Sequence, residues 1–225
     1  MYFFIYEKEV EPVNLRNNLF DKKDGAVRIA YDEVNAAGDL AKAIQHLLPA
    51  GISSRPIVII CIGTDRSTGD SLGPLVGTLL EEKRLSSFYV YGTLENPVHA
   101  VNLAEKLDEI KKLHFNPFII GIDACLGRLK SVGVIQAGDG PVKPGAGVNK
   151  DLPEVGHIHI TGIVNVSGFM EFFVLQNTRL HLVLNMARTI ANGIYKASLT
   201  YDSNPIMSAF KLEADNEQDM KESKV

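Results

Sequence analysis

Three short apolar runs, separated by segments with helical spacing, constrain the fold of this sequence more than any other feature. The runs are IVIICIG (57–63), FYVYGTL (88–94) and PFIIGID (117–123). Continuous runs of this kind are typical of strands buried on both faces of a parallel sheet. Because Pro74 is tolerated only in a first helical turn, the helix after the first run should begin around 70–73. This alternation predicts an α/β fold, a three-layer α/β/α sandwich with a mostly parallel sheet.

Further elements flank this centre. Apolar residues at helical spacing predict helices over 35–48, 97–113 and about 170–195. Segments rich in β-branched residues predict strands over 131–138 and 157–165. We expect a single domain over 1–210, with short irregular strands (YFFIY and AVRIAY) within 1–33. The charged tail 211–225 lacks periodicity and is expected to be disordered.

Composition excludes several classes of function. The formal net charge is −4, and no basic stripe with interleaved aromatic residues is present, so nucleic acid is not an expected partner. No run reaches the roughly 18 apolar residues of a membrane span. The N-terminus lacks the basic segment and the long apolar segment of a signal peptide, so we do not expect one. The two cysteines suit a reducing compartment, and we expect the protein in the cytoplasm.

Two aspartates should meet although they are distant in the sequence. In doubly wound sheets the first and third core strands lie side by side, and ligands bind beyond their carboxyl ends. Here those ends carry TDRSTGD (64–70) and DACLGR (123–128), which brings Asp70 towards Asp123. Such a pair could hold a divalent metal or share a proton as an acid and a base. The alternatives are structural: Asp70 as a helix N-cap, and Asp123 paired with Arg66 or Arg128.

The same segment contains the letters GDSL (69–72), which are shared with a class of esterases whose nucleophile is the serine. A nucleophilic Ser71 needs an oriented base within hydrogen-bond reach. After residue 160 the only histidine is His181, inside an apolar helix with no aspartate nearby. Cys125 lies close to the expected crevice, but a free cysteine is more often a small buried apolar residue. We therefore place the chemistry on the aspartates and keep a GDSL-type esterase as a lesser alternative.

Four segments taken in order resemble the germination protease of spore-forming bacteria: IGTDRSTGDSLGPLVG, YGTLENPVHA, IIGIDACLGR and KPGAGVNKDLPEVGHIHITGIVNVSGF. They resemble the YyaC-type sporulation proteins most closely and the hydrogenase-maturation endopeptidases more distantly. The resemblance covers about 56–170 and implies a three-layer fold of the phosphorylase/hydrolase-like kind. It also implies that Asp70 and Asp123 are the functional carboxylates.

In the maturation endopeptidases the equivalent acids are metal ligands, joined by a histidine. At that place this chain reads KPGAG (143–147), with no histidine. A divalent metal at Asp70 and Asp123 would therefore need a substitute ligand, and His99, His157 and His159 are the candidates, with His99 and His159 preferred. Each also has an ordinary interpretation as a surface or hydrogen-bonded histidine.

The resemblance leads us to expect a peptidase acting on a spore protein or a protein precursor in a sporulating cell or forespore. We expect the loop 138–156 to border the substrate groove. The substrate-binding candidates are Gly92, Thr93, Gly145, Gly147 and Asn149. The main alternative is a catalytically inactive binding or regulatory protein on the same fold. A homo-oligomer is left open.

Overall fold

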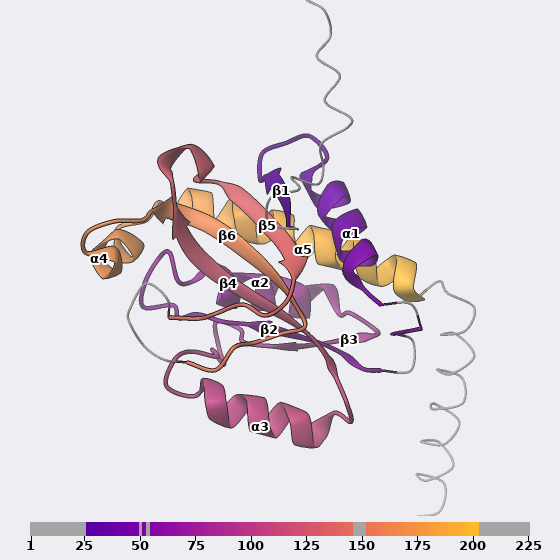
Figure 1. Ribbon diagram of the computed structural model, residues 1–225. Coiled ribbons are helices and arrows are strands. Elements are labelled where there is room, and N and C mark those ends of the chain that lie inside the picture. The colour runs from indigo at the N-terminus through magenta and orange to yellow at the C-terminus, as the bar shows by residue number, and fades with distance from the viewer. Residues whose placement is uncertain (1–25, 50, 53–54, 146–151, 203–225) are drawn as a thin grey trace, which may run out of the picture.

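The computed structural model describes residues 26–49, 51–52, 55–145 and 152–202. It contains a six-stranded sheet with the order β1-β5-β6-β4-β2-β3 (Figure 1). The strands are β1 (Val27–Ala30), β2 (Ile57–Cys61), β3 (Phe88–Tyr91), β4 (Phe118–Gly127), β5 (Val134–Asp139) and β6 (Ile158–Val166). The helices are α1 (Ala36–Leu47), α2 (Leu72–Lys83), α3 (Leu103–Leu113), α4 (Glu171–Gln176) and α5 (Leu180–Asp202), with a short 3-10 turn at Leu129–Ser131.

The centre of the sheet is parallel, as the apolar runs predict. Strand β2 pairs in parallel with β3 and with β4, and β4 pairs in parallel with β6. Strand β5 is antiparallel to β6 and to β1 at the other side of the sheet. The prediction that the first and third core strands are neighbours is confirmed, because they are β2 and β4.

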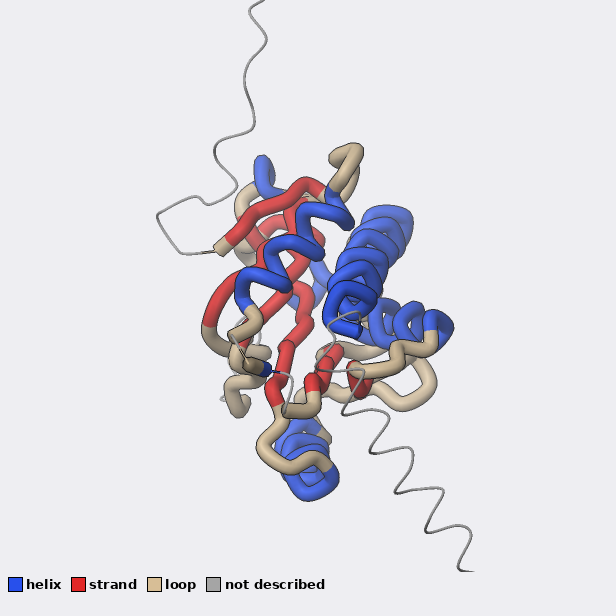
Figure 2. The backbone as a smooth tube through the Cα atoms, turned by 90° about the vertical axis from the view of Figure 1, so that its right-hand side faces the viewer, coloured by secondary structure: helices blue, strands red, loops and turns tan. Residues whose placement is uncertain are grey.

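Helices cover the two faces of the sheet unequally. The larger apolar core lies between one face and α1, α2 and α5. The smaller core lies on the other face, where Leu103, Leu107 and Ile110 of α3 pack over residues of β2 and β4. Figure 2 shows α3 alone at the bottom of the view, apart from the other long helices. The α/β architecture is therefore as predicted, and among the described residues α3 alone forms the helical layer on the second face.

Helix α2 packs against the sheet by backbone contact. A side chain at Gly73 would collide with the backbone of Ile62, and one at Gly77 would collide with that of Gly92. These glycines let the first turns of α2 approach the carboxyl ends of β2 and β3. The close packing determines where the loop before α2 lies.

Two predicted helices differ from the structure. The helix expected over 97–113 begins only at Leu103, since the Asn102 side chain accepts a hydrogen bond from the His99 amide and donates one to the Pro97 carbonyl. Val98 instead forms a parallel bridge with Ile62.

The single helix expected from about 170 to 195 is two helices, α4 and α5, with a break at 177–179. The hydroxyl of Thr178 donates a hydrogen bond to the carbonyl of Val174, and the side-chain amide of Asn177 donates one to the carbonyl of Phe173. Side-chain groups that bond local carbonyls in this way compete with helix continuation. Helix α5 then extends beyond the predicted end, to Asp202.

Other predictions are close to the observed bounds or fall outside the described residues. The helix predicted over 35–48 is α1, and the AVRIAY strand is β1. The expected YFFIY strand and the charged tail lie outside the described residues. Within the described residues, no helix combines the length and apolarity needed to cross a bilayer.

Candidate active site

Asp123 lies where the sheet loses one of its central strands. The last pair between β2 and β4 joins Cys61 and Ile122, so Asp123 is the first residue of β4 beyond the end of β2. On its other side it pairs with Thr161 of β6. One carboxylate oxygen accepts a hydrogen bond of 2.8 Å from the Ala124 amide. The side chain is thus held on a rigid strand and remains partly exposed.

Asp70 ends the loop that leaves β2. Its carbonyl accepts a hydrogen bond from the Thr64 amide, which closes the loop at its base. A Cβ at Gly63 would collide with this carbonyl, so the tight closure requires glycine. The amide of Gly69 donates to the carbonyl of Leu175, which ties the loop to α4. Asp70 is not the N-cap of α2, because that position belongs to Ser71.

The two carboxylates are close enough to affect one another. Burial raises the pKa of Asp123 to about 8; the Ala124 amide opposes this increase and the charge of Asp70 adds to it. Burial also raises the pKa of Asp70, and the Ser67 hydroxyl partly offsets that change. The Ser67 Oγ is itself buried and has no hydrogen-bond partner within bonding distance among the described residues. The pair can therefore hold a proton near neutral pH, as neighbouring carboxyl groups do.

In the described part of the chain, neither aspartate forms an ion pair with a cation. The ion pairs among the described residues join Lys42 to Asp39, Lys106 to Glu109 and Lys143 to Glu154. Arg66 and Arg128, the two partners considered from the sequence, are both exposed. The raised pKa values are consistent with this lack of a positive partner.

Ser71 lacks the surroundings of a nucleophile. It is buried, and its hydroxyl donates a hydrogen bond of 2.7 Å to the carbonyl of Thr68. Its amide donates to the carbonyl of Ser67. The geometry corresponds to a turn residue that starts a helix, so the structure does not support the esterase alternative.

The histidines do not complete a metal site with the aspartates. Across the described residues, no three side chains of histidine, cysteine, aspartate or glutamate form a group that could hold a metal ion. The Nδ1 of His99 accepts the Val101 amide, and that of His159 lies 3.1 Å from the carbonyl of Gly140. His157 stacks on Phe118, the first residue of β4, at the end of that strand away from Asp123.

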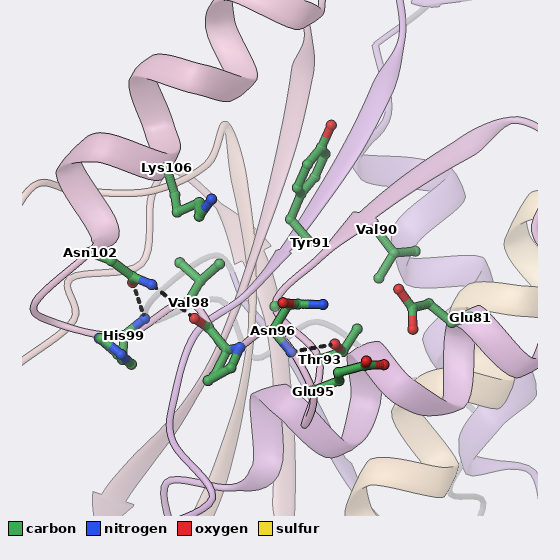
Figure 3. Close-up of a pocket in the computed structure, with 12 residues that line it drawn as sticks. Glu81, Val90, Tyr91, Thr93, Glu95, Asn96, Val98, His99, Asn102 and Lys106 are labelled. Carbon is green, nitrogen blue, oxygen red and sulfur yellow. Dashed lines mark hydrogen bonds between the residues drawn. The ribbon is translucent and has the colours of Figure 1, made fainter.

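A polar groove of about 400 Å³ lies beside β3 (Figure 3). Gly92, Thr93 and His99 line it, and so does Val98, which bridges Ile62 next to the end of β2. Asp70 and Asp123 are not among its lining residues. Thr93 is buried, and its hydroxyl accepts the Asn96 amide at 3.1 Å, a bond drawn in Figure 3.

Gly92 also has a packing role, because a Cβ there would collide with the Cys61 carbonyl. Of the other substrate-binding candidates, Gly145 has the left-handed φ of 77°. Gly147 and Asn149 lie outside the described residues. The start and end of the loop that contains them are joined by hydrogen bonds between Val142 and Val155.

Asp123 has two polar neighbours, of which the sequence analysis considered Cys125 and missed Thr161. Thr161 lies beside it in register, and Cys125 follows two residues later in β4. Burial raises the pKa of the Cys125 thiol to about 11; hydrogen bonding with the Thr161 side chain and the charge of Arg28 lower it, and the charge of Asp123 raises it. Strand alternation could have suggested Thr161, whereas the register that aligns it with Asp123 comes from the structure.

The fold and this site define an α/β protein with a carboxylate pair at the carboxyl end of its central parallel strands. The chain belongs to the family described as "Protein of unknown function (DUF1256)", whose model matches residues 28–193. It is 59% identical over 185 residues to the protein described as "Uncharacterized protein YyaC" from Bacillus subtilis (strain 168), across 81% of this chain and 89% of that protein. The resemblance to YyaC-type proteins is thereby confirmed.

A solved structure with a similar chain is the [NiFe] hydrogenase maturation protease HycI from Thermococcus kodakarensis KOD1. It matches with a TM-score of 0.43 and 16% sequence identity, over 69% of this chain and 97% of that chain.

Proposed function

We propose that this protein is a peptidase of the germination-protease type, which hydrolyses peptide bonds of a spore protein or protein precursor with Asp70 and Asp123. The observation that carries the proposal is the proximity of the two carboxylates, the second with a pKa near 8, where β2 ends. Neighbouring acids with perturbed pKa values are typical of acid–base sites. The family resemblance of the motifs around both residues supports the choice of a peptide bond as the substrate.

The pair can divide the chemistry of hydrolysis between an acid and a base. Near neutral pH Asp123 retains its proton and donates it to the carbonyl oxygen of the scissile bond. Asp70 accepts a proton from water, whose oxygen attacks the carbonyl carbon. When the tetrahedral intermediate collapses, Asp70 passes that proton to the leaving amine and Asp123 recovers its own from the hydroxyl. One water is consumed, and both carboxyl groups return to their starting states.

The residues present do not fit the three-ligand metal site of the maturation endopeptidases. Within the described residues, the aspartates have no histidine, cysteine or further acid grouped with them as a third ligand. Metal sites of that kind use three protein ligands and leave one position open for water. The proposed mechanism therefore uses the two carboxyl groups without a metal.

The test is cleavage of natural protein mixtures. Purified full-length protein is incubated with acid-extracted protein from Bacillus spores and, separately, with a lysate of sporulating cells. New N-termini are then identified by mass spectrometry. The wild-type protein should generate them, whereas Asp70→Asn and Asp123→Asn should reduce their formation by at least about a hundredfold.

Asp65→Asn is the matched control, because Asp65 lies in the same loop and is exposed. It should cleave like the wild-type protein. If no mixture yields new N-termini across a range of pH, the peptidase proposal fails. Capture of an intact spore protein that both aspartate variants still bind would instead establish the binding-protein alternative.

A further inference from the structure

A row of polar residues crosses the sheet and ends at Asp123. Arg28 of β1 pairs with Gln136 of β5, Gln136 pairs with Thr161 of β6, and Thr161 pairs with Asp123 of β4. Residues paired in register occupy equivalent positions on adjacent strands, so this row lies on one face of the sheet. It joins an edge strand to the candidate active site.

Helix α3 does not extend over this part of the face. The apolar contacts of α3 are with residues of β2 and β4 and with Val142 and Val155, and they include no residue of β1, β5 or β6. Figure 1 shows α3 below the sheet, at the opposite side from β1. Arg28 is exposed, and Gln136 and Thr161 are partly exposed. As far as the described residues go, a polypeptide could therefore lie across the row and reach Asp123.

The Arg28 guanidinium has no ion-pair partner among the described residues. The side chain of Arg28 also forms no hydrogen bond with another residue in the described part of the chain. Its neighbours in β1, Val27 and Ile29, are buried in the larger core, which fixes the backbone from which its side chain projects. The charges of Arg28 and Asp123 both act on the thiol of Cys125, two residues beyond Asp123 in β4, so both lie within electrostatic range of that thiol.

We propose that Arg28 determines specificity by binding a carboxylate of the polypeptide whose peptide bond lies at Asp123. The inference rests on the proposed function and adds a substrate feature to it. A guanidinium binds carboxylates through paired, charge-assisted hydrogen bonds. Three strand spacings of about 4.8 Å place the backbone of Arg28 roughly 14 Å from that of Asp123. An extended chain advances about 3.3 Å per residue, so the carboxylate belongs within about four residues of the scissile bond.

Two sources of this carboxylate must be distinguished: an aspartate or glutamate side chain, and the C-terminus of the substrate. The probes are fluorescein-labelled dodecapeptide pools, each with glutamate, glutamine or lysine at one position and mixed residues elsewhere. Each pool is made with a free and with an amidated C-terminus. Binding is measured by fluorescence anisotropy on full-length protein carrying Asp123→Asn, which should leave the peptides intact.

We expect glutamate at one position, or a free C-terminus, to tighten binding about tenfold over the neutral counterpart, as a charge-assisted contact of ordinary strength allows. Adding Arg28→Gln should abolish the preference, and Arg28→Glu should transfer it to lysine. Arg188→Glu is the control, because Arg188 is also exposed but belongs to α5 on the opposite side of the sheet. It should leave the preference unchanged.

The inference is overturned if no pool binds, if acidic and neutral pools bind alike, or if the preference survives Arg28→Gln. Cleavage is followed in parallel with protein that retains Asp123. A carboxylate preference that depends on Arg28 in the absence of any cleavage would sustain this inference and remove the proposed function. Cleavage without a carboxylate preference would sustain the proposed function and overturn this inference.

Discussion

Asp70 lies close enough to Asp123 for its charge to raise the pKa of the second carboxyl group, although one residue ends a loop and the other lies within a strand. This proximity depends on two features of the backbone. Strand β2 stops one residue short of Asp123, and the loop that follows it folds back on itself between Thr64 and Asp70. Two distant segments of the sequence thus form one acid pair.

Replacing Asp123 by asparagine should change stability in a pH-dependent way. Because the folded pKa of about 8 is above the ordinary 3.8, the folded state retains a proton that the unfolded state has lost. The wild-type protein therefore loses stability as pH rises from about 4 to 8. Asp123→Asn removes this loss and should be more stable than wild type at pH 8, by on the order of a few kcal/mol, and similar at pH 4.

Urea unfolding at both pH values measures this difference, with Asp65→Asn as the control that should follow the wild-type protein. An Asp123→Asn variant that is less stable than wild type at pH 8 would show that the carboxylate has a partner in the folded state.

The rate of cleavage should fall on both sides of an optimum. Cleavage needs one proton on the pair, so kcat/KM should decline above about pH 8 as Asp123 ionises. It should also decline on the acid side, at a pH above the ordinary range of an aspartate, because burial raises the pKa of Asp70. The two apparent pKa values of this profile belong to the coupled pair and not to either aspartate alone. A rate that stays constant from pH 7 to 10 would contradict the role of Asp123 as the acid.

Ser71→Ala should preserve cleavage. The Ser71 hydroxyl donates to the Thr68 carbonyl and has no histidine partner among its hydrogen bonds, so its loss should cost about 1 kcal/mol of folding stability. Cleavage assays, thermal unfolding and labelling with a fluorophosphonate measure the two effects. Stoichiometric labelling of Ser71, together with loss of activity in Ser71→Ala, would restore the esterase interpretation.

Gly73→Ala should destabilise the protein by about 1–3 kcal/mol, because the added methyl group collides with the backbone of Ile62. Gly140→Ala is the comparison: Gly140 has a φ of 86°, but a Cβ there meets no atom. That change should cost only the backbone strain of about 1 kcal/mol. Urea unfolding distinguishes the two. Equal losses would show that α2 can move away from β2.

Removal of metal should leave cleavage unchanged. In the described part of the chain, Asp70 and Asp123 lack the third ligand of a transition-metal site. Dialysis against EDTA followed by the cleavage assay, with emission spectrometry to confirm removal, measures the effect. Loss of activity that zinc, manganese or nickel restores would show that a ligand from outside the described residues completes a metal site.

Much of the fold follows from local patterns. The apolar runs predicted β2, β3 and β4 because strands buried on both faces must be continuously apolar. The alternation with helices predicted that β2 and β4 are neighbours, as they are in the structure. From that pairing we expected Asp70 and Asp123 to lie near one another. Helix bounds were less predictable at 97–113 and 170–195, since the Asn102 and Thr178 side chains bind backbone groups there instead of leaving the helix uninterrupted.

Local patterns in the sequence therefore predicted the parallel centre of the sheet, the helices that cover it, the loop that ends at Asp70 and the strand that carries Asp123, because burial and chain connectivity act locally. The protonation of the pair depends on the three-dimensional arrangement, since the pKa of Asp123 depends on burial and on a charge brought from another segment. The tertiary structure also decided that Arg28 and Asp123 share one open row, because strand register is set by pairing across the sheet.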